Sequence, residues 1–574
     1  MYFTLAISAA TRGACAALVS AATGTDPRTM PIPGPPLVGW EAKDGRTAVL
    51  VWPGGSQAAA RSHGGTIWAD QDGVHGRTGV TRVDPVYLAE VPGAVVVSDR
   101  ACWAAAVAGR LGEPDPVMVA AFLALGYPVG AATPFRGVRA LGGRRRLTAA
   151  SGRLVVTADR GESTGAGSYD SVAAALADEV RPLGERGVPV ELSLTGGKDS
   201  RLIAAALTAA KVPFLARTHG FASHPDVIVA GMIARRLGVE HQVTEPRPAA
   251  REHAAEHTGD EADLLARLRS AVLVSDGMLS AFENVGRPDP VVTAAPVQTG
   301  GHGGELLRGG YAPAAWSDRR PARAWSETRA AELFRRMVTR RLGLLRPAAA
   351  RAYLASLAPF AATLPRGPLR TLDDFYLVNR AGRWSANARQ AYLIRSPLVQ
   401  PFFSDRVVKA ARAIPLPDRI TDRLHRGVLA ALCPELLDLP LSGTDWKSGP
   451  RTPPVQPAAA AGPAAAGPAA AGPAAAGPAE ASDWRRGYGD QMARLLRDYT
   501  LEHGAAGGMF DIVRRSAAER ALRPPQQDSH AAWALATLAA LLSGDWLNAR
   551  EGGEISRGRT ASQPARRTPL PPRA

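Results

Sequence analysis

The segment that decides the fold is VELSLTGGKDSRLIAAAL, residues 190–207. It starts as a short apolar run typical of a strand, turns at two adjacent glycines, and continues as an Ala/Leu/Ile-rich stretch with helical character. A strand that passes through a glycine turn directly into a helix is the repeating unit of parallel α/β sheets. The segment therefore predicts an α/β fold in this part of the chain.

The residues that follow repeat this pattern. VPFLARTHG at 212–220 precedes the helical stretch DVIVAGMIARRLG at 226–238, and a further apolar run reaches a glycine-rich turn within 290–311. Strands that alternate with helices at this spacing predict a parallel, doubly wound sheet. Because such sheets bind ligands at the carboxyl ends of their strands, we expect the turn at 195–200 to border a ligand.

The flanking regions have other patterns. Short β-type runs between Gly, Pro and Asp turns predict a mostly β domain before about residue 145, and the chain is helical from about 370. A Gly-Pro repeat every five residues at 457–479 predicts a flexible spacer, since the unit is too short for a repeat fold. We place five segments: a β domain, an α/β domain, an Ala/Gly/Pro linker, a further helical part and a disordered basic tail, at 1–150, 170–450, 451–482, 483–550 and 551–574.

Composition places the chain among soluble proteins with several domains. It has 574 residues, 46% of them hydrophobic and 21% charged, and no run of about 18 apolar residues that would indicate a membrane span. The amino terminus lacks the cationic start of a secretory signal. The three cysteines, Cys15, Cys102 and Cys433, lack the spacing of a zinc or iron–sulfur site. We therefore expect a cytoplasmic protein without membrane partners.

The net charge is +16, from 68 Lys and Arg against 52 Asp and Glu. Such an excess can indicate a nucleic-acid partner. Here it consists mainly of arginines spread along the chain, which is typical of a solvated surface. We predict no nucleic-acid partner.

The turn at 195–200 has the chemistry of an anion site. Its glycines allow backbone N–H groups to point inward, the following helix adds partial positive charge, and Thr195 and Ser200 add hydroxyls. Asp199 would repel a phosphate unless a cation lay between them, so it implies Mg²⁺. The alternative is a strand-to-helix turn with no ligand.

Two segments carry a resemblance to a known family. LTGGKDSR resembles the SGGxDS pyrophosphatase loop of the asparagine-synthetase-like N-type ATP pyrophosphatases, and TGGHGGELLRGGY at 299–311 resembles their second loop, SGEGADELFGGY. Segments 226–242, 379–411 and 423–440 extend the resemblance, and 122–147 is similar to the end of the glutaminase-like domain that precedes these synthetases. The residue sequence of the first loop, LTGGKDSR, is most similar to that of the lasso-peptide macrolactam cyclases of the albusnodin type.

The resemblance implies a fold and a ligand set. It implies a mostly β, Ntn-type glutaminase-like domain before a doubly wound ATP-pyrophosphatase domain with a helical carboxyl-terminal part. Tyr2 stands where the glutaminase cysteine would follow Met1, so that domain is expected to be degenerate. The implied ATP-binding residues are Ser193, Thr195, Gly196, Gly197, Lys198, Asp199, Ser200, Gly300, Gly301 and Gly303. Mg²⁺ would be held by Asp199 and by Glu305, which stands where the family has Asp.

Two further residues have implied catalytic roles. His302 replaces a family Glu, and an imidazole with a pKa near 6.5 could take a proton from the attacking ammonium. It could instead pack or contact a phosphate. Lys447 resembles the lysine that stabilises charge on the activated groups, although a solvated surface lysine would need no explanation.

The implied function is ATP-dependent macrolactam formation. An Asp or Glu side chain of a ribosomal precursor peptide would be adenylated and then attacked by the peptide's α-amine. A leader-binding protein and a leader peptidase are the implied partners. The alternatives are a small-molecule asparagine- or β-lactam-synthetase-like ligase, an inactive peptide-binding member, and a tRNA-modifying pyrophosphatase.

Overall fold

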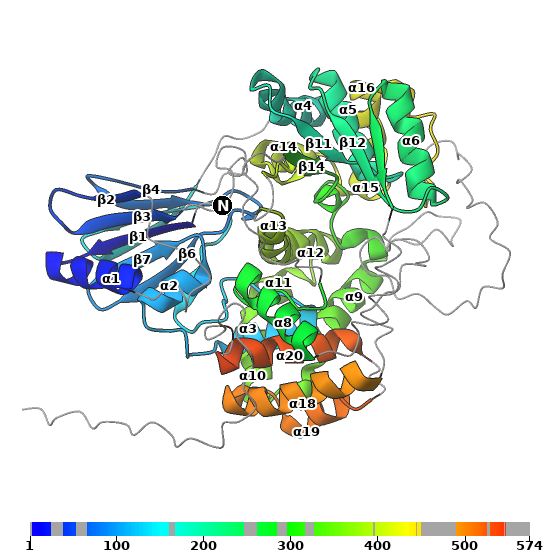
Figure 1. Cartoon of the computed structure of the whole chain (residues 1–574). Coiled ribbons are helices and arrows are strands. Elements are labelled where there is room, and N and C mark those ends of the chain that lie inside the picture. The colour runs from blue at the N-terminus through cyan, green and yellow to red at the C-terminus, as the bar shows by residue number, and fades with distance from the viewer. Residues whose placement is uncertain are drawn as a thin grey trace, which may run out of the picture.

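Two kinds of sheet and a large helical region make up the protein, as seen in a computed structural model (Figure 1). The described strands up to Ala158 form antiparallel sheets, later strands form a parallel sheet, and helices dominate the other described residues. The fold is α/β, as the sequence predicts. The structure describes residues 3–24, 38–52, 66–159, 167–245, 261–283, 296–315, 326–393, 397–443, 445–448, 490–524, 528–544 and 546.

The antiparallel part is a pair of sheets. One has the order β2-β3-β1-β7-β6-β8 and the other β10-β9-β5-β4. Their strands are β1 Phe3–Ala9, β2 Val38–Glu41, β3 Thr47–Trp52, β4 Thr66–Asp70, β5 Gly73–Arg77, β6 Tyr87–Val91, β7 Ala94–Ser98, β8 Val138–Ala140, β9 Arg145–Ala150 and β10 Arg153–Ala158. Because β10 pairs with β9, this pair of sheets extends eight residues past the predicted domain end at 150.

Alternation along β1 explains how the two sheets are covered. Leu5 and Ile7 belong to the core that also contains residues of α1 (Arg12–Gly24) and α2 (Ala101–Val107), whereas Ala6 belongs to the separate core between the sheets. Successive side chains of a strand point to opposite faces, so one strand contributes to both layers. The six-stranded sheet is therefore covered by helices on one face and by the second sheet on the other.

The parallel sheet has the order β13-β12-β11-β14. Its strands are β11 Val190–Ser193, β12 Leu215–His219, β13 His241–Thr244 and β14 Val297–Gly300, and the neighbouring helices are α4 Tyr169–Glu185, α5 Lys198–Ala209 and α6 Pro225–Leu237. All three pairings are parallel, which confirms the parallel sheet predicted from strands that alternate with helices. The chain proceeds from β11 to one side through β12 and β13, and β14 lies on the other side of β11.

The helical region supplies the rest of the core. Its helices include α8 Glu261–Ser275, α9 Glu327–Thr339, α10 Pro347–Ser356, α11 Ala358–Thr363, α12 Pro368–Phe375, α13 Ala386–Leu393, α14 Asp405–Arg412, α15 Leu416–Ile420, α16 Arg423–Leu432, α18 Asp490–Ala506, α19 Arg515–Ala521 and α20 Ser529–Ser543. No helix among the described residues combines the length and the apolar character needed to cross a bilayer. The predicted linker at 451–482 and the predicted tail at 551–574 lie outside the described residues.

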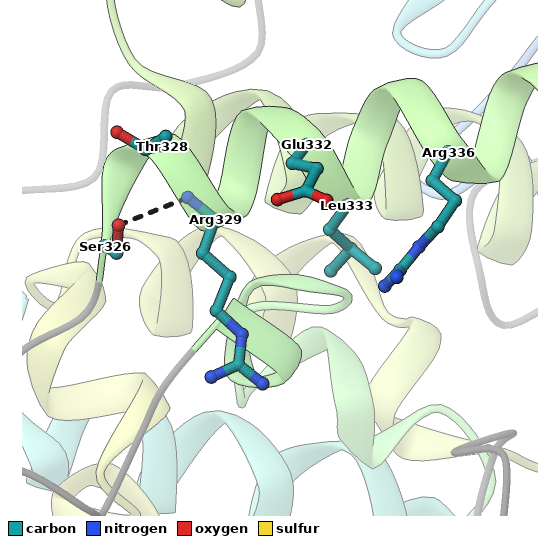
Figure 2. A pocket seen from close by; sticks show the side chains of 6 residues that line it. All are labelled: Ser326, Thr328, Arg329, Glu332, Leu333 and Arg336. Carbon is teal, nitrogen blue, oxygen red and sulfur yellow. Dashed lines mark hydrogen bonds between the residues drawn. The ribbon is translucent and has the colours of Figure 1, made fainter.

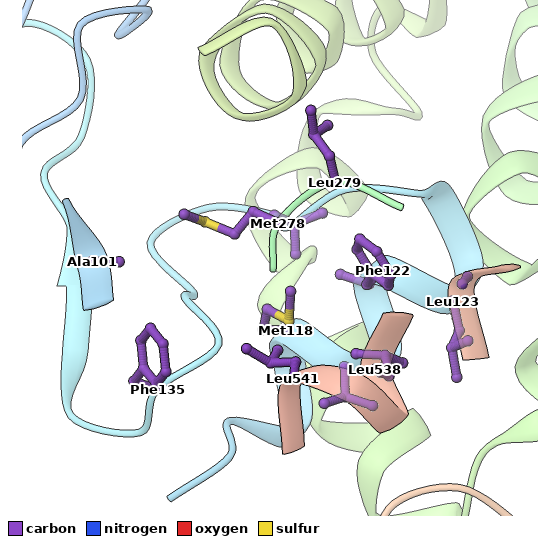
Figure 3. Packing of buried hydrophobic residues seen from close by; sticks show 14 of the residues in the cluster. Ala101, Met118, Phe122, Leu123, Phe135, Met278, Leu279, Leu538 and Leu541 are labelled. Carbon is purple, nitrogen blue, oxygen red and sulfur yellow. The ribbon is translucent and has the colours of Figure 1, made fainter. Parts of the chain in front are cut away.

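Helix α3, Pro116–Leu125, joins the first region to the last. Its residues 118–124 are all buried, and it contacts α9, α10 and α20. Figure 3 shows Met118, Phe122 and Leu123 of α3 beside Leu538 and Leu541 of α20. A helix that is apolar on every side must be surrounded by other elements of the protein, as α3 is by these helices. The two ends of the chain therefore share one hydrophobic core.

A π-helix, η4, covers Tyr376–Ser385 between α12 and α13. The first region holds it by polar contacts: Arg82 donates to the carbonyls of Gly130 and Val378, and the amide of Gly130 donates to Asn379 Oδ1. Arg383 of the π-helix donates to the carbonyl of Ala132. Long π-helical segments are rare and are frequently found at functional sites.

Candidate active site

The two glycine turns meet at one edge of the parallel sheet. β11 and β14 are paired with Ser193 opposite Gly300, so the turns that follow them leave the sheet side by side. Because the helical connections diverge from these two strands, their carboxyl ends form the switch point at which open α/β sheets bind ligands. The structure thus brings together the two loops that the sequence separates by about 100 residues.

Glycine is required where the turns touch. A Cβ on Gly301 would lie 2.5 Å from the backbone nitrogen of Ser200, and one on Gly304 would overlap the Asp199 carboxylate. Gly303 has φ +92°, and a Cβ there would lie 2.8 Å from the Phe403 ring. The second turn can pack against the first only without side chains at these positions.

Asp199 lies at the centre of the contact between the turns. Its Oδ1 lies 2.9 Å from Nε2 of the buried His425, and its Oδ2 lies 2.7 Å from Nη2 of Arg308. Burial alone would raise the pKa of Asp199, but Arg308 and the hydrogen bond from His425 outweigh it and lower the pKa to about 2. Asp199 is therefore a carboxylate across the physiological pH range.

Arg308 lies between the two predicted metal ligands. The same Nη2 atom lies 2.7 Å from Asp199 and 3.8 Å from Glu305, and the charge of Asp199 raises the pKa of Arg308 despite its burial. Two carboxylates facing one point have the donor chemistry that Mg²⁺ prefers, with phosphates and water as its remaining ligands. Within the described residues no third His, Cys, Asp or Glu joins them as a metal-binding group. The pair fits Mg²⁺ if Arg308 moves away from the carboxylates.

The amides of the first turn have acceptors within the protein. Thr195 N donates to Ser200 Oγ at 3.1 Å, Gly196 N to Asp226 Oδ1 at 3.0 Å, and Gly197 N to Thr195 Oγ1 at 3.2 Å. A phosphate would have to replace these acceptors. The amino terminus of α5 has no side-chain cap at Gly197, which leaves it suited to an anion.

Asp422, which was not among the predicted site residues, contacts both of the predicted site lysines, Lys198 and Lys447. Lys198 Nζ lies 2.5 Å from Asp422 Oδ2, and the Lys447 amide donates to the same oxygen at 3.1 Å. Burial opposes ionisation of Asp422, but the charge of Lys198 and its hydrogen bond lower the pKa below its usual value. Lys447 Nζ donates to the carbonyl of Ile420 at 3.3 Å. These contacts keep both lysines beside the first turn.

We refer to the charged residues around these turns as the Asp199 cluster. Each of its three carboxylates faces a cation, and its members come from the two glycine turns and from the segment before and within α16. The members are Lys198, Asp199, Glu305, Arg308, Asp422 and His425.

His302 lies apart from the Asp199 cluster, among aromatic rings. Its ring centre is 5.9 Å from that of Trp384 and 5.4 Å from that of Phe403, and its buried Nε2 has no hydrogen-bond partner among the described residues. Burial, reinforced by the charges of Arg380 and Arg389, lowers the pKa of His302 to about 4. At neutral pH the imidazole is uncharged. It is then a weaker base than a free histidine.

One surface pocket is lined by residues outside both turns. It has a volume of about 420 Å³ and is lined by Ser326, Thr328, Arg329, Glu332, Leu333 and Arg336 at the start of α9 (Figure 2). Ser326 caps this helix by accepting from the amide of Arg329 at 3.2 Å. None of the predicted site residues lines this pocket.

No protein-family model and no curated protein matches this chain.

Proposed function

We propose that this chain is an ATP- and Mg²⁺-dependent carbon–nitrogen ligase that forms a macrolactam in a ribosomal precursor peptide, giving a lasso peptide. The observation that carries the proposal is the meeting of the two glycine turns at the switch point, with Asp199 between them. In this proposal the parallel sheet is an ATP-pyrophosphatase domain, and the antiparallel sheets are a degenerate Ntn-type glutaminase-like domain. The chain would act in the cytoplasm.

The residues of the first turn would receive the nucleotide. The phosphates would lie against the amides of Gly196 and Gly197 and the start of α5, with Ser193, Thr195 and Ser200 beside them. Gly300, Gly301 and Gly303 would let the second turn approach closely. Asp199 and Glu305 would hold the Mg²⁺ of the bound ATP, which would supply the activation of a carboxylate with AMP and pyrophosphate as products.

The remaining residues have roles toward the peptide. Lys198 and Lys447, held beside the first turn by Asp422 and Ile420, would stabilise negative charge on the reacting groups. Neutral His302 has a free lone pair or N–H at its buried Nε2 and could accept the proton of the attacking amine. Because the amine and the carboxylate belong to one peptide, holding that peptide folded would supply most of the rate by proximity.

The test is incubation of the full chain with Mg²⁺, ATP and the precursor peptide from a neighbouring reading frame. We expect the peptide to lose one water as AMP and pyrophosphate appear, and Asp199→Ala to abolish all three. Arg515→Met, a surface change on α19, is the matched control and should leave them unchanged. Formation of asparagine from aspartate and ammonia would favour the small-molecule ligase instead, and full turnover by Asp199→Ala would refute the assignment of the turns.

A further inference from the structure

A second group of residues, from three distant parts of the chain, surrounds one guanidinium. Tyr127 follows α3, two residues belong to the second glycine-turn segment, and three lie on the π-helix η4. We refer to this group as the Arg380 cluster. Its members are Tyr127, His302, Tyr311, Tyr376, Arg380 and Trp384.

Arg380 is held by rings and not by a carboxylate. Its Cζ lies 3.4 Å from the ring centre of Trp384 and 5.7 Å from that of Tyr127. The residue is half-buried, and among the described residues its guanidinium makes no hydrogen bond or ion pair. Stacking fixes the guanidinium while leaving its donors available.

Among the described residues no acidic side chain forms an ion pair with Arg380, although the charge of Glu305 reaches Tyr311 and Tyr376. Burial raises the pKa of both Tyr127 and Tyr311, so their hydroxyls, which are 2.7 Å apart, stay neutral. Nε2 of His302 is buried without a partner, and so are Nε and Nη2 of the nearby Arg389. A half-buried guanidinium with no ion-pair partner among the described residues, close to the unpaired buried donors of Arg389, favours an anion.

The Arg380 cluster adjoins the predicted nucleotide turns. His302 lies within the second turn, and Tyr311 ends the segment that contains Glu305 and Arg308. The ring of Tyr376 lies 5.0 Å from that of Tyr311 and within electrostatic range of Glu305. An anion at Arg380 would therefore lie next to the Asp199 cluster.

The chemistry of the Arg380 cluster selects a carboxylate over a phosphate. It offers one cation, whereas a nucleotide phosphate with a larger charge finds Lys198, the amides and a helix start at the first turn. A guanidinium matches the two oxygens of a carboxylate, and the rings beside it suit the apolar stem of an acidic side chain. We propose that Arg380 binds the Asp or Glu side-chain carboxylate that is to be activated, with Trp384 as a wall of the site.

This inference deepens the proposed function and gives the first region a direct part in it. Tyr127 forms one side of the cluster, and the contacts of Arg82 and Gly130 fix the π-helix that carries Arg380. The antiparallel domain would then build part of the substrate site and would not serve as a scaffold alone.

The first experiment needs no turnover and uses the full chain. Phenylglyoxal modifies accessible guanidinium groups, and mass spectrometry of the proteolysed protein reports the extent at Arg380. The probes are N-acetyl-aspartate methylamide, its uncharged asparagine analogue and inorganic phosphate. We expect the aspartyl probe alone to protect Arg380, while Arg515, stacked on Phe510 at 5.3 Å, is unprotected by all three.

The second experiment measures the precursor peptide reaction in variants. Arg380→Met should raise KM for the peptide about 10- to 100-fold, the range for losing a charge-assisted hydrogen bond, with a smaller effect on kcat and none on KM for ATP. Arg380→Lys keeps the charge but loses the two-pronged geometry, so it should recover only part of the loss. Thermal unfolding of Arg380→Met should match that of Arg515→Met.

The outcomes separate this inference from the proposed function. Protection by phosphate and not by the aspartyl probe, or an unchanged KM in Arg380→Met, would overturn the carboxylate site even if AMP and pyrophosphate are formed. Selective protection by the aspartyl probe without any AMP formation would support the carboxylate site and refute the proposed ligase.

Discussion

The Asp199 cluster and the Arg380 cluster both touch the second glycine turn, but their charges are balanced differently. In the Asp199 cluster each carboxylate faces a cation of the same chain. In the Arg380 cluster the guanidinium rests on aromatic rings and, within the described residues, has no counter-charge. Removing one partner from a balanced cluster leaves the other charge unpaired, whereas an unpaired guanidinium remains available to a ligand. Removing a charged side chain should therefore lower stability in the first cluster, whereas removing the Arg380 charge from the second should weaken ligand binding.

The largest expected effect is that of Asp199→Ala. It would leave Arg308 and the buried His425 without their partner, and removing one member of a buried pair costs about 4 kcal/mol of unfolding free energy. Urea unfolding at neutral pH measures this loss. Asp438→Ala, at an exposed position on the surface, is the matched control and should change stability by less than about 0.5 kcal/mol. An Asp199→Ala variant as stable as this control would show that Arg308 and His425 do not depend on Asp199 for their pairing.

The next largest effect concerns pH and His302. Its pKa is lowered to about 4 in the folded chain, so the unfolded chain binds the proton more readily below about pH 6.5. Its contribution is present above that pH and is lost as the pH falls toward 4, amounting to about 3 kcal/mol. The difference between the stability curves of the native chain and of His302→Gln should show this loss. Parallel curves from pH 7 to 4 would show that the imidazole is solvated.

A smaller effect distinguishes two glycines of the turns. A Cβ on Gly304 would overlap the Asp199 carboxylate, whereas one on Gly197 meets only Thr195 Oγ1 at 3.3 Å. Gly304→Ala should therefore cost about 2 kcal/mol by overpacking, and Gly197→Ala much less. Thermal unfolding of the pair measures the difference. Equal losses would show that the second turn is not packed against Asp199 at Gly304.

The smallest effect concerns the hydroxyl pair of the Arg380 cluster. Tyr127→Phe and Tyr311→Phe each remove one side of a 2.7 Å hydrogen bond and should each cost about 1 kcal/mol. The double variant should cost little more than either single one, because the same bond is lost. Additive losses in the double-mutant cycle would show that the two hydroxyls are not partners.

The sequence predicted the parts of the molecule that depend on local pattern. The glycine turns, the strands that precede them and the helix after Gly197 follow from spacing within short segments, and the parallel pairing of β11 with β14 confirms the expected sheet. Thr195, Lys198 and Asp199 lie within one turn of the chain, so a motif is enough to find them. Their roles toward a nucleotide stay predictions.

The partners of these residues could not be predicted in the same way. His425 and Asp422 lie more than 200 residues from Asp199 and Lys198, and only folding brings them together. Arg308 could have been predicted from the sequence, because it follows Glu305 by three residues in the second glycine loop. The Arg380 cluster combines residues from three distant segments, near positions 127, 302 and 380. A local sequence pattern therefore could not predict it.

Helix α3 has a consequence for how this protein is made. Its buried face is completed by α20, whose Leu538 leaves the ribosome about 400 residues after Phe122. At translation speeds of about 5 to 20 residues per second, α20 is synthesised roughly 20 to 80 seconds after α3. During synthesis this apolar segment is a natural substrate for chaperones, and a truncated transcript lacking α20 should yield an insoluble product even though the antiparallel sheets are complete.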